Sequence, residues 1–263
     1  MKNLKFILVL IFGFLSSSCN LDEDPIFLDA TLYDNPDSAA AALDGIYQKL
    51  TTYDSMERRY WVINGFSGLF VTHRQGNSVN NPHNSSLMAL NPIQDQVSEA
   101  FWRGLYGAIA QTNAAIENIT VVENPITNDE LLFSDIKGQA YFARAWAYFD
   151  LTRLFKDIPL WTELPDENNL NKAKSTTKEV YAQVISDAKM AASLINGKSG
   201  IGYPKQYAAN MLLAKLYMAL ATNPDLREES LTEMDYWQMA FDEAIKVYGQ
   251  YSLVADYSSI FTD

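Results

Sequence analysis

Few residues in this sequence have the types and spacing that catalysis requires. The two histidines, His73 and His83, lie in one stretch rich in glycine and asparagine, without the helical spacing or third ligand of a zinc site. The single cysteine, Cys19, lies near the amino terminus. The sequence contains neither a nucleophile elbow nor a phosphate-binding or dinucleotide-binding loop. We therefore predict no catalytic residue, no metal and no cofactor, so that the protein is not an enzyme.

A second group of residues is suited to binding a sugar. The C–H faces of a pyranose stack on tyrosine or tryptophan, and its hydroxyl groups bond to arginine, asparagine and similar side chains. Tyr60 and Trp61 precede His73, Arg74 and Asn77 in the same stretch. These five residues are the predicted ligand contacts. For Trp61, packing in the core beneath the stretch and stacking on a ligand are equally compatible with the sequence.

These candidate contacts lie in a long segment, residues 53–96, that lacks helical periodicity and is rich in turn-forming residues. A loop of this length is either functional or disordered, and its aromatic residues favour order. Helical patterns are predicted at residues 35–50, 97–119, 134–155, 176–195, 207–220 and 233–248. Small residues recur where paired helices would approach closely. The pattern predicts a mostly α-helical body like a tetratricopeptide (TPR) array, with a long irregular loop excursion.

The stretch from Gly138 to Leu160 is predicted to organise the rest of the chain. Its apolar residues cover the helix beyond a single stripe, so we expect neighbours on several sides. Asp150 can reach Arg153 one turn later, or a charge on another helix, and Pro159 ends the helix. Three tryptophans on helical stripes are predicted to be core residues: Trp102, Trp146 and Trp237. Trp161 is compatible with a core or a surface position.

This stretch resembles the core signature of the SusD/RagB family, the surface glycan-binding lipoproteins of Bacteroidetes. The resemblance rests on Arg144-Ala145, Leu151, Arg153-Leu154-Phe155 and Ile158-Pro159-Leu160. Further matches follow in order along the chain: Leu21-Asp22 with Pro25, Trp102 with Tyr106, Ile109 and Asn113, Glu179-Val180-Tyr181, and Trp237 with Tyr251-Ser252-Leu253. Lys156 departs from the family, which commonly has glycine or asparagine there. If its backbone is left-handed, lysine is a strained choice.

The resemblance carries three implications for the architecture. It implies a TPR-like helical body, independently of the periodicity. It implies that the irregular excursion contributes to the ligand face, where an arginine just before a glycine maps onto Arg74. It also covers only about the front half of the family, so the C-terminal half of the family fold is expected to be absent. Apolar surface should then be exposed on the outermost helix pair.

The amino terminus has the pattern of an export signal. Lys2 and Lys5 precede a short apolar run, and small residues lead to Cys19, which resembles the acylated cysteine of a bacterial lipobox. The predicted organisation is a signal peptide at 1–18, an acylated tether at 19–34 and one SusD-like helical domain at 35–263. The acidic residues at 22–24 resemble an export tag for the outer leaflet, although a merely solvated tether is the alternative.

Charge and resemblance together define the expected function. The net charge is −12 and becomes −14 without the leader, which excludes nucleic acid as an expected partner. The resemblance implies an outer-membrane lipoprotein that faces the cell exterior, binds oligosaccharides and delivers them to a SusC-like TonB-dependent transporter. The alternative is a helical-repeat lipoprotein adaptor that binds a peptide or protein without glycan binding. A surface glycosidase is a weaker third reading.

Overall fold

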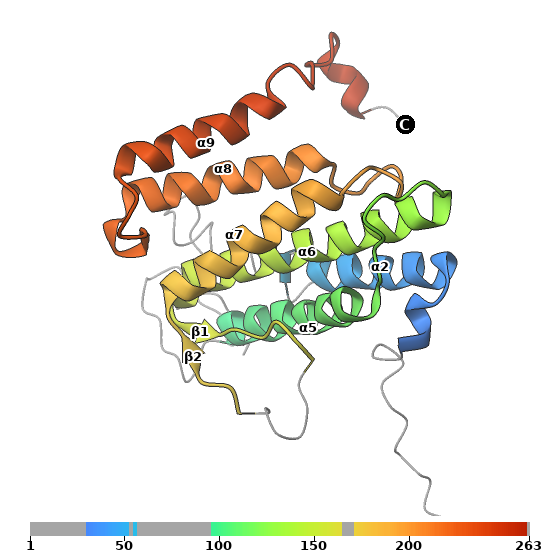
Figure 1. Cartoon of the computed structure of the whole chain (residues 1–263), viewed down its shortest axis with the longest axis horizontal. Coiled ribbons are helices and arrows are strands. Elements are labelled where there is room, and N and C mark those ends of the chain that lie inside the picture. Colours follow the sequence, from blue (N-terminus) through green and yellow to red (C-terminus); the bar gives the residue numbers. More distant parts are fainter. Residues whose placement is uncertain (1–29, 53–54, 57–95, 165–170, 262–263) are drawn as a thin grey trace, which may run out of the picture.

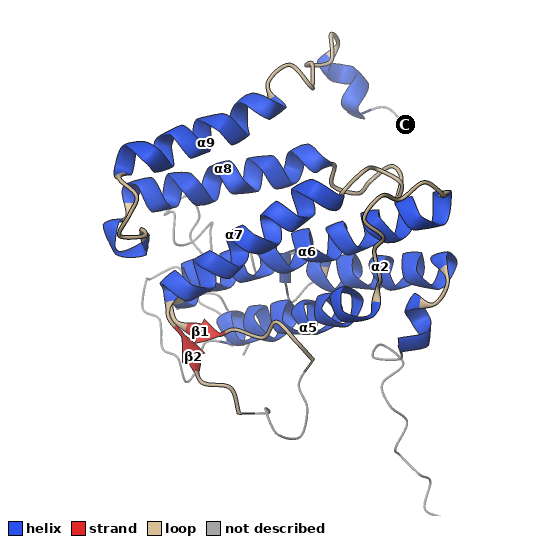
Figure 2. Cartoon of the chain, in the orientation of Figure 1, coloured by secondary structure: helices blue, strands red, loops and turns tan. Residues whose placement is uncertain are grey.

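The protein is built from stacked helices, as predicted. The computed structural model describes residues 30–52, 55–56, 96–164 and 171–261. Helices dominate this part of the chain, and its two strands form one short antiparallel pair in which Ile158 faces Ser175 (Figure 2). In chain order the elements are η2 (Ala30–Tyr33), α2 (Pro36–Thr51), α5 (Gln96–Asn118), α6 (Asn128–Phe155), β1 (Ile158–Pro159), β2 (Lys174–Ser175), α7 (Thr177–Leu194), α8 (Gln206–Thr222), η4 (Pro224–Leu226), α9 (Glu233–Val247) and η5 (Tyr257–Phe261).

The helices are layered in the manner of a helical-repeat protein. Helix α6 packs against α2, α5 and α7, then α7 packs against α8, and α8 against α9 (Figure 1). Each element therefore buries its apolar face mainly against its neighbours along the chain. The predicted TPR-like fold class is confirmed. Residues 30–33, at the end of the expected tether, form η2 and pack on α2 and α5.

Side-chain caps define where several helices begin. The hydroxyl of Thr176 accepts a hydrogen bond from the Glu179 amide, and the Glu179 carboxylate accepts one from the Thr176 amide. This capping box begins α7 next to residue 176, where the sequence predicts a helix to start. Thr127 and Glu130 form the same arrangement at the start of α6. Helix α6 consequently begins at Asn128, earlier than the predicted residue 134. The prediction followed the apolar run and gave too little weight to the capping signal at Thr127.

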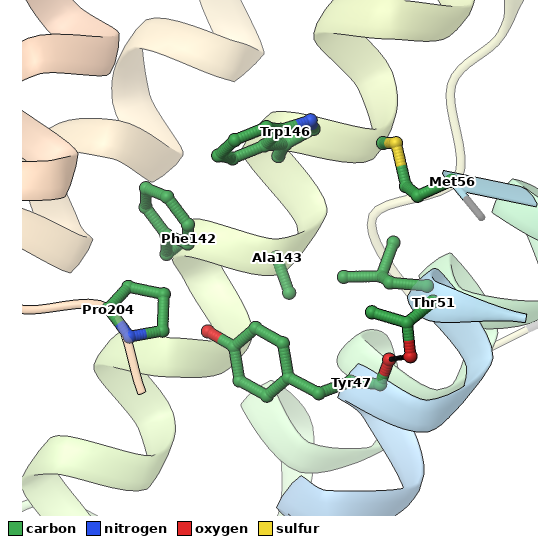
Figure 3. Close-up of a pocket in the computed structure, with 8 residues that line it drawn as sticks. Tyr47, Thr51, Met56, Phe142, Ala143, Trp146 and Pro204 are labelled. Atoms are coloured by element: carbon green, nitrogen blue, oxygen red, sulfur yellow. Dashed lines mark hydrogen bonds between the residues drawn. The ribbon is translucent and has the colours of Figure 1, made fainter. Parts of the chain in front are cut away.

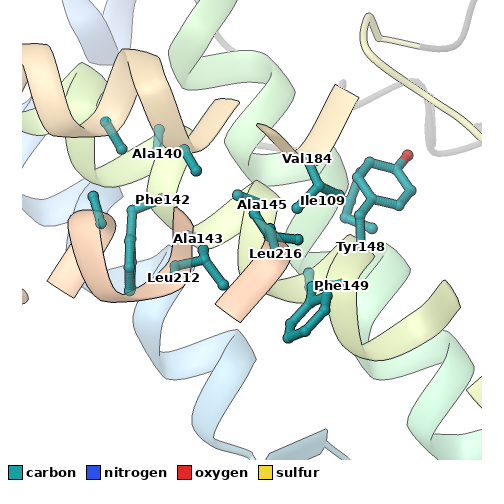
Figure 4. Packing of buried hydrophobic residues seen from close by; sticks show 14 of the residues in the cluster. Ile109, Ala140, Phe142, Ala143, Ala145, Tyr148, Phe149, Val184, Leu212 and Leu216 are labelled. Carbon is teal, nitrogen blue, oxygen red and sulfur yellow. The ribbon is translucent and has the colours of Figure 1, made fainter. Parts of the chain in front are cut away.

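Helix α6 is the centre of the core. Its apolar side chains contact helices on more than one side, and Ala140, Ala143 and Ala145 keep the distances short (Figure 4). Gly138 permits the closest approach, because a Cβ atom there would lie 2.8 Å from the backbone nitrogen of Ile195. The expectation that this helix is covered on several sides is confirmed along most of its length.

A buried ion pair fastens α6 to α7. The guanidinium group of Arg144 donates to Asp187 through Nε at 2.8 Å and Nη2 at 2.7 Å, and both side chains are at most 4% exposed. Its Nη1 donates to Asn113 Oδ1 on α5 and to the carbonyl oxygen of Thr162. Arg144 thus joins three helices to the segment after β1, residues 160–164, through charge-assisted hydrogen bonds. We refer to this segment as the strap.

The two ends of this helix pair are also closed by side chains. The Asp135 carboxylate accepts bonds from the amides of Asn196, Gly197 and Ser199, which holds the turn after α7. At the other end Lys156 has φ 61° and ψ −109°, so φ is positive but the residue lies outside the left-handed helical region. Its amide and carbonyl both bond to Thr152, which maintains this strained conformation.

The last helix pair exposes apolar side chains, as expected. Phe241 and Ile245 on α9 are exposed, and Leu253 in the following segment is 98% exposed. Trp102 and Trp237 are half-buried and pack against the core, so their predicted position is largely correct. Trp146 was also predicted to be a core residue, and this prediction is wrong.

Candidate functional site

An apolar pocket lies between α2 and α6. Its volume is about 350 Å³. Helix α2 contributes one wall and α6 the other, while the segment before α8 closes one end (Figure 3). The lining residues are Tyr47, Leu50, Thr51, Met56, Phe142, Ala143, Trp146 and Pro204. This volume and this mixture of apolar and aromatic walls are typical of small-molecule sites.

Helical periodicity places three of these side chains on one face of α6. Phe142 and Ala143 precede Trp146 by four and three positions, so both share a face of the helix with it. In Figure 3, the rings of Phe142 and Trp146 lie on the α6 side of the pocket and Tyr47 lies on the α2 side, with Ala143 between them. The rings of Phe142 and Trp146 meet edge to face with centroids 5.6 Å apart. A small residue between two large rings creates the concavity.

Trp146 is 42% exposed, which corrects the prediction that it is a core residue. Its indole Nε1 donates to Asp150 Oδ2 at 2.9 Å, one turn further along α6. Asp150 also accepts from Arg153 at 3.3 Å, so the predicted ion pair within the helix is confirmed. These contacts hold the tryptophan in a defined orientation beside the pocket. A tryptophan fixed in this way is a suitable platform for a flat apolar surface.

Burial changes the ionisation of the carboxyl group that holds Trp146. Asp150 is 4% exposed, and loss of solvation raises its pKa to about 6. The positive charge of Arg153, the bond from the Trp146 indole and the charge of Lys215 on α8 act in the opposite direction. The orientation of the exposed indole therefore depends on a carboxyl group that titrates in weakly acidic conditions.

The polar groups of the pocket are already used within the protein. The Tyr47 hydroxyl donates to Gln139 Oε1 at 2.6 Å, and burial raises the pKa of Tyr47. The Thr51 hydroxyl donates to the Tyr47 carbonyl oxygen at 2.9 Å. The pocket consequently presents ring faces and aliphatic groups to a ligand, without a nucleophile or general base among its described lining residues.

A smaller cavity lies between α5 and the segment after β1. It measures about 140 Å³ and is bordered by Tyr106, Ile109, Ala110, Asn113 and Trp161. Trp161 is half-buried, and the ammonium group of Lys172 lies 5.0 Å from its ring centroid. The Asn113 amide donates to the carbonyl oxygens of Trp161 and Glu163, so it fixes the strap. This cavity is too small for a sugar ring with its hydroxyl groups.

The residues predicted from the sequence as ligand contacts lie outside the described residues. This applies to Tyr60, Trp61, His73, Arg74 and Asn77, and the predicted lipidation site Cys19 also lies outside. Sequence reasoning missed Trp146 as a pocket residue. The spacing of Trp146, Asp150 and Arg153 could have indicated its exposure. Two charged residues within about two turns of an aromatic residue suggest that this face of the helix lies at the edge of the core.

The described part of the chain contains neither a cluster of potential metal ligands nor a helix that could span a membrane. No group of three or more histidine, cysteine, aspartate or glutamate side chains there is arranged to hold a metal ion. No helix there has both the length and the apolar character needed to cross a membrane.

Comparison with known proteins gives consistent results. Residues 27–218 match the SusD-like family described as "Starch-binding associating with outer membrane". SusD-like protein P2 of Formosa agariphila is 27% identical over 241 residues, which cover 88% of this chain and 46% of that protein. A SusD-like protein of Bacteroides ovatus is 23% identical, covering 88% of this chain and 42% of that protein. The chain therefore spans about half the length of these curated relatives.

Solved structures show the same fold. A SusD homolog from Bacteroides thetaiotaomicron superposes with a TM-score of 0.67 at 22% identity, covering 86% of this chain and 43% of that one. A laminarin-binding SusD-like protein superposes with a TM-score of 0.63 at 20% identity, covering 86% and 47%. A structure determined with a xylogluco-oligosaccharide gives 0.66 at 18% identity, covering 86% and 43%. At these identities the likeness concerns the fold.

Proposed function

This chain belongs to the SusD-like family, and on that premise we propose that it is a surface lipoprotein that captures oligosaccharides and delivers them to a SusC-like TonB-dependent transporter. The observation that carries the proposal is the family match over residues 27–218, whose description combines starch binding with the outer membrane. Two proteins of the same fold support it, one named for binding laminarin and one determined with a xylogluco-oligosaccharide.

The helical body supports a role in binding rather than in catalysis. Buried contacts such as the Arg144–Asp187 pair hold the helices in one arrangement, so the body can present ligand-binding side chains with little loss of conformational entropy. We place the main ligand contacts at Tyr60, Trp61 and Arg74, with His73 and Asn77, as the sequence predicts. Delivery to a transporter requires only that the ligand is bound and released, so the proposal includes no chemical step.

Attachment to the membrane is assigned to Cys19. Acylation at this residue would anchor the protein to the outer membrane, and the acidic residues that follow would direct it to the face exposed to the medium. Mass spectrometry of the amino-terminal peptide should find acyl chains on Cys19, and Cys19→Ser should release the protein from the membrane fraction. An unmodified cysteine in membrane-bound protein would contradict the assignment.

Binding can be tested by electrophoresis of the full chain, purified in detergent, through gels that contain laminarin or xyloglucan. Binding should retard the wild type, and Arg74→Ala should abolish the retardation. Arg103→Ala is the matched control, because Arg103 is exposed and pairs only with Glu99 in the described residues. Unretarded wild type across a panel of glycans would refute the proposal. Purification of the chain from outer membranes with a bound β-barrel protein would test the transporter step.

The apolar character of the α2–α6 pocket favours the second candidate function, a peptide-binding adaptor. An apolar side chain would fill this pocket without leaving a hydroxyl group unpaired, whereas a sugar would lose some of its hydrogen bonds there. Glycan retardation that is insensitive to Arg74→Ala, together with saturable binding of a defined aromatic-rich peptide that Trp146→Ala weakens, would favour the adaptor.

A further inference from the structure

A second concave surface lies where α7, α8 and α9 meet. Its volume is about 460 Å³, and its lining residues are Lys189, Ala192, Ser193, Gln206, Tyr207, Asn210, Leu213, Glu243 and Lys246. These three helices lie side by side in Figure 1. Most of the lining side chains carry polar atoms, in contrast to the α2–α6 pocket. We refer to this surface as the α7–α9 groove.

The Glu243 carboxylate occupies a central position in the hydrogen bonding of this groove. Its Oε2 accepts from the Asn210 side-chain amide at 2.8 Å, and its Oε1 accepts from Lys246 Nζ at 2.8 Å. The residue is half-buried on α9. A carboxylate has about four acceptor positions, so two remain after these bonds. Glu243 is thus held in place with acceptor capacity available for hydroxyl groups.

Asn210 supplies a second acceptor, and its orientation is determined by chemistry. A carboxylate only accepts hydrogen bonds, so the Nδ2 group of Asn210 must face Glu243 and Oδ1 must point elsewhere. Asn210 is 4% exposed, and within the described residues its Oδ1 accepts no hydrogen bond. This oxygen is not one of the fully buried side-chain atoms that lack a partner in the described residues, so it remains an acceptor open to solvent. A ligand hydroxyl group in the groove could donate to it.

Donors and an aromatic ring complete the set. Lys189 lines the groove from α7, and among the described residues its ammonium group has no bonding partner. Tyr207 lines it from α8. The hydroxyl group of Tyr207 donates to Gln250 Oε1 at 2.9 Å, and its ring meets that of Tyr251 edge to face at 5.9 Å. The ring is therefore fixed before any ligand arrives, which reduces the entropy lost on binding.

We propose that the α7–α9 groove binds one pyranose unit of a glycan through its hydroxyl groups. This inference rests on the proposed glycan-binding function and adds contacts made by residues of the helical body to those predicted among residues 60–77. Glu243 and Asn210 accept hydrogen bonds from the sugar, Lys189 donates one, and Tyr207 contacts its C–H face.

The test measures affinity by titration calorimetry on the full chain in detergent, with laminarin and xyloglucan oligosaccharides as probes. Glu243→Gln and Lys189→Met should each weaken binding about tenfold or more, because each removes a charged hydrogen-bonding partner. Lys178→Met is the matched control, since Lys178 is an exposed lysine in the first turn of the same helix α7. Thermal unfolding of each variant shows whether the fold is retained.

The possible results separate this inference from the function on which it rests. Wild-type affinity in both groove variants, with loss of binding in Arg74→Ala, would overturn the groove assignment and leave the function standing. Failure of the wild type to bind any saccharide would overturn both. Weakening in Glu243→Gln and Lys189→Met but not in Lys178→Met would support the inference.

Discussion

Replacing Gly138 with alanine should destabilise the contact between the two central helices, α6 and α7. The added Cβ atom would lie 2.8 Å from the backbone nitrogen of Ile195 and 2.9 Å from Leu194 Cβ, closer than such atoms can approach. Both neighbours belong to or adjoin the backbone of α7 and cannot rotate away. Overpacking typically costs about 1–3 kcal/mol, and the better helix propensity of alanine returns about 1 kcal/mol. We expect a net loss of up to about 2 kcal/mol in unfolding free energy.

Two other helix glycines are matched controls. A Cβ atom at Gly45 would meet nothing within 4 Å, so Gly45→Ala should stabilise the protein by about 0.5–1 kcal/mol. At Gly107 the added atom would lie 2.7 Å from Lys49 Cε, near the end of a flexible side chain that can move. Gly107→Ala should therefore be neutral or slightly stabilising. The same chemical change is expected to destabilise the protein at Gly138, to stabilise it at Gly45 and to have little effect at Gly107. The difference comes from the atoms that surround each position.

Urea unfolding followed by far-ultraviolet circular dichroism measures all three variants under the same conditions. Unfolding midpoints should shift with little change in the dependence of free energy on urea, since the surface exposed on unfolding is nearly unchanged. A Gly138→Ala variant as stable as Gly45→Ala would refute the reasoning, because it would show that α7 can move away from α6 without cost.

Three further expectations concern buried charges and exposed apolar groups. The pKa of Asp150 is about 6 in the folded state against an ordinary 3.8, so its contribution to stability is present below about pH 4 and is lost as the pH rises through 6. This difference in pKa corresponds to about 3 kcal/mol of unfolding free energy. Asp150→Asn should remove that part of the pH dependence of urea unfolding. A pH dependence that is the same in the variant would contradict the effect of burial. Arg144→Met should cost about 3–5 kcal/mol, because Asp187 is left buried and unpaired. Adding Asp187→Leu should recover part of that loss, and strictly additive losses would show that the two residues do not interact. Residues 20–263, expressed alone, should aggregate or bind a hydrophobic dye through exposed residues such as Phe241 and Ile245. Replacing both residues with serine should reduce the fluorescence of the dye. A stable monomer that binds no dye would refute the expectation.

Most of the helices could be predicted because their signals are local. Apolar periodicity and caps such as Thr176 with Glu179 depend on residues a few positions apart, and the structure confirms them. The Asp150–Arg153 ion pair was predictable for the same reason. The early start of α6 at Asn128 carried an equally local signal at Thr127, which was outweighed by the stronger apolar run that follows.

Contacts between distant segments could not be predicted with the same success. Arg144 is part of the sequence signature, but its partner Asp187 lies 43 positions away on α7. Nothing in one sequence specifies which acid a buried arginine will meet. Asn210 and Glu243 in the α7–α9 groove are 33 positions apart and likewise come together only through the stacking of helices. The predicted contacts Tyr60, Trp61 and Arg74 stay predictions.

The exposure of Trp146 follows from a difference in helix length that the sequence pattern does not contain. Helix α6 has 28 residues and its neighbour α2 has 16, so at 1.5 Å per residue α6 is longer by about 18 Å. An apolar run indicates that a helix must be covered, but the extent of cover depends on where each neighbour ends. Helix α2 ends at Thr51, which lines the pocket together with Trp146. The pocket therefore lies where the shorter helix ends and the apolar face of the longer one continues.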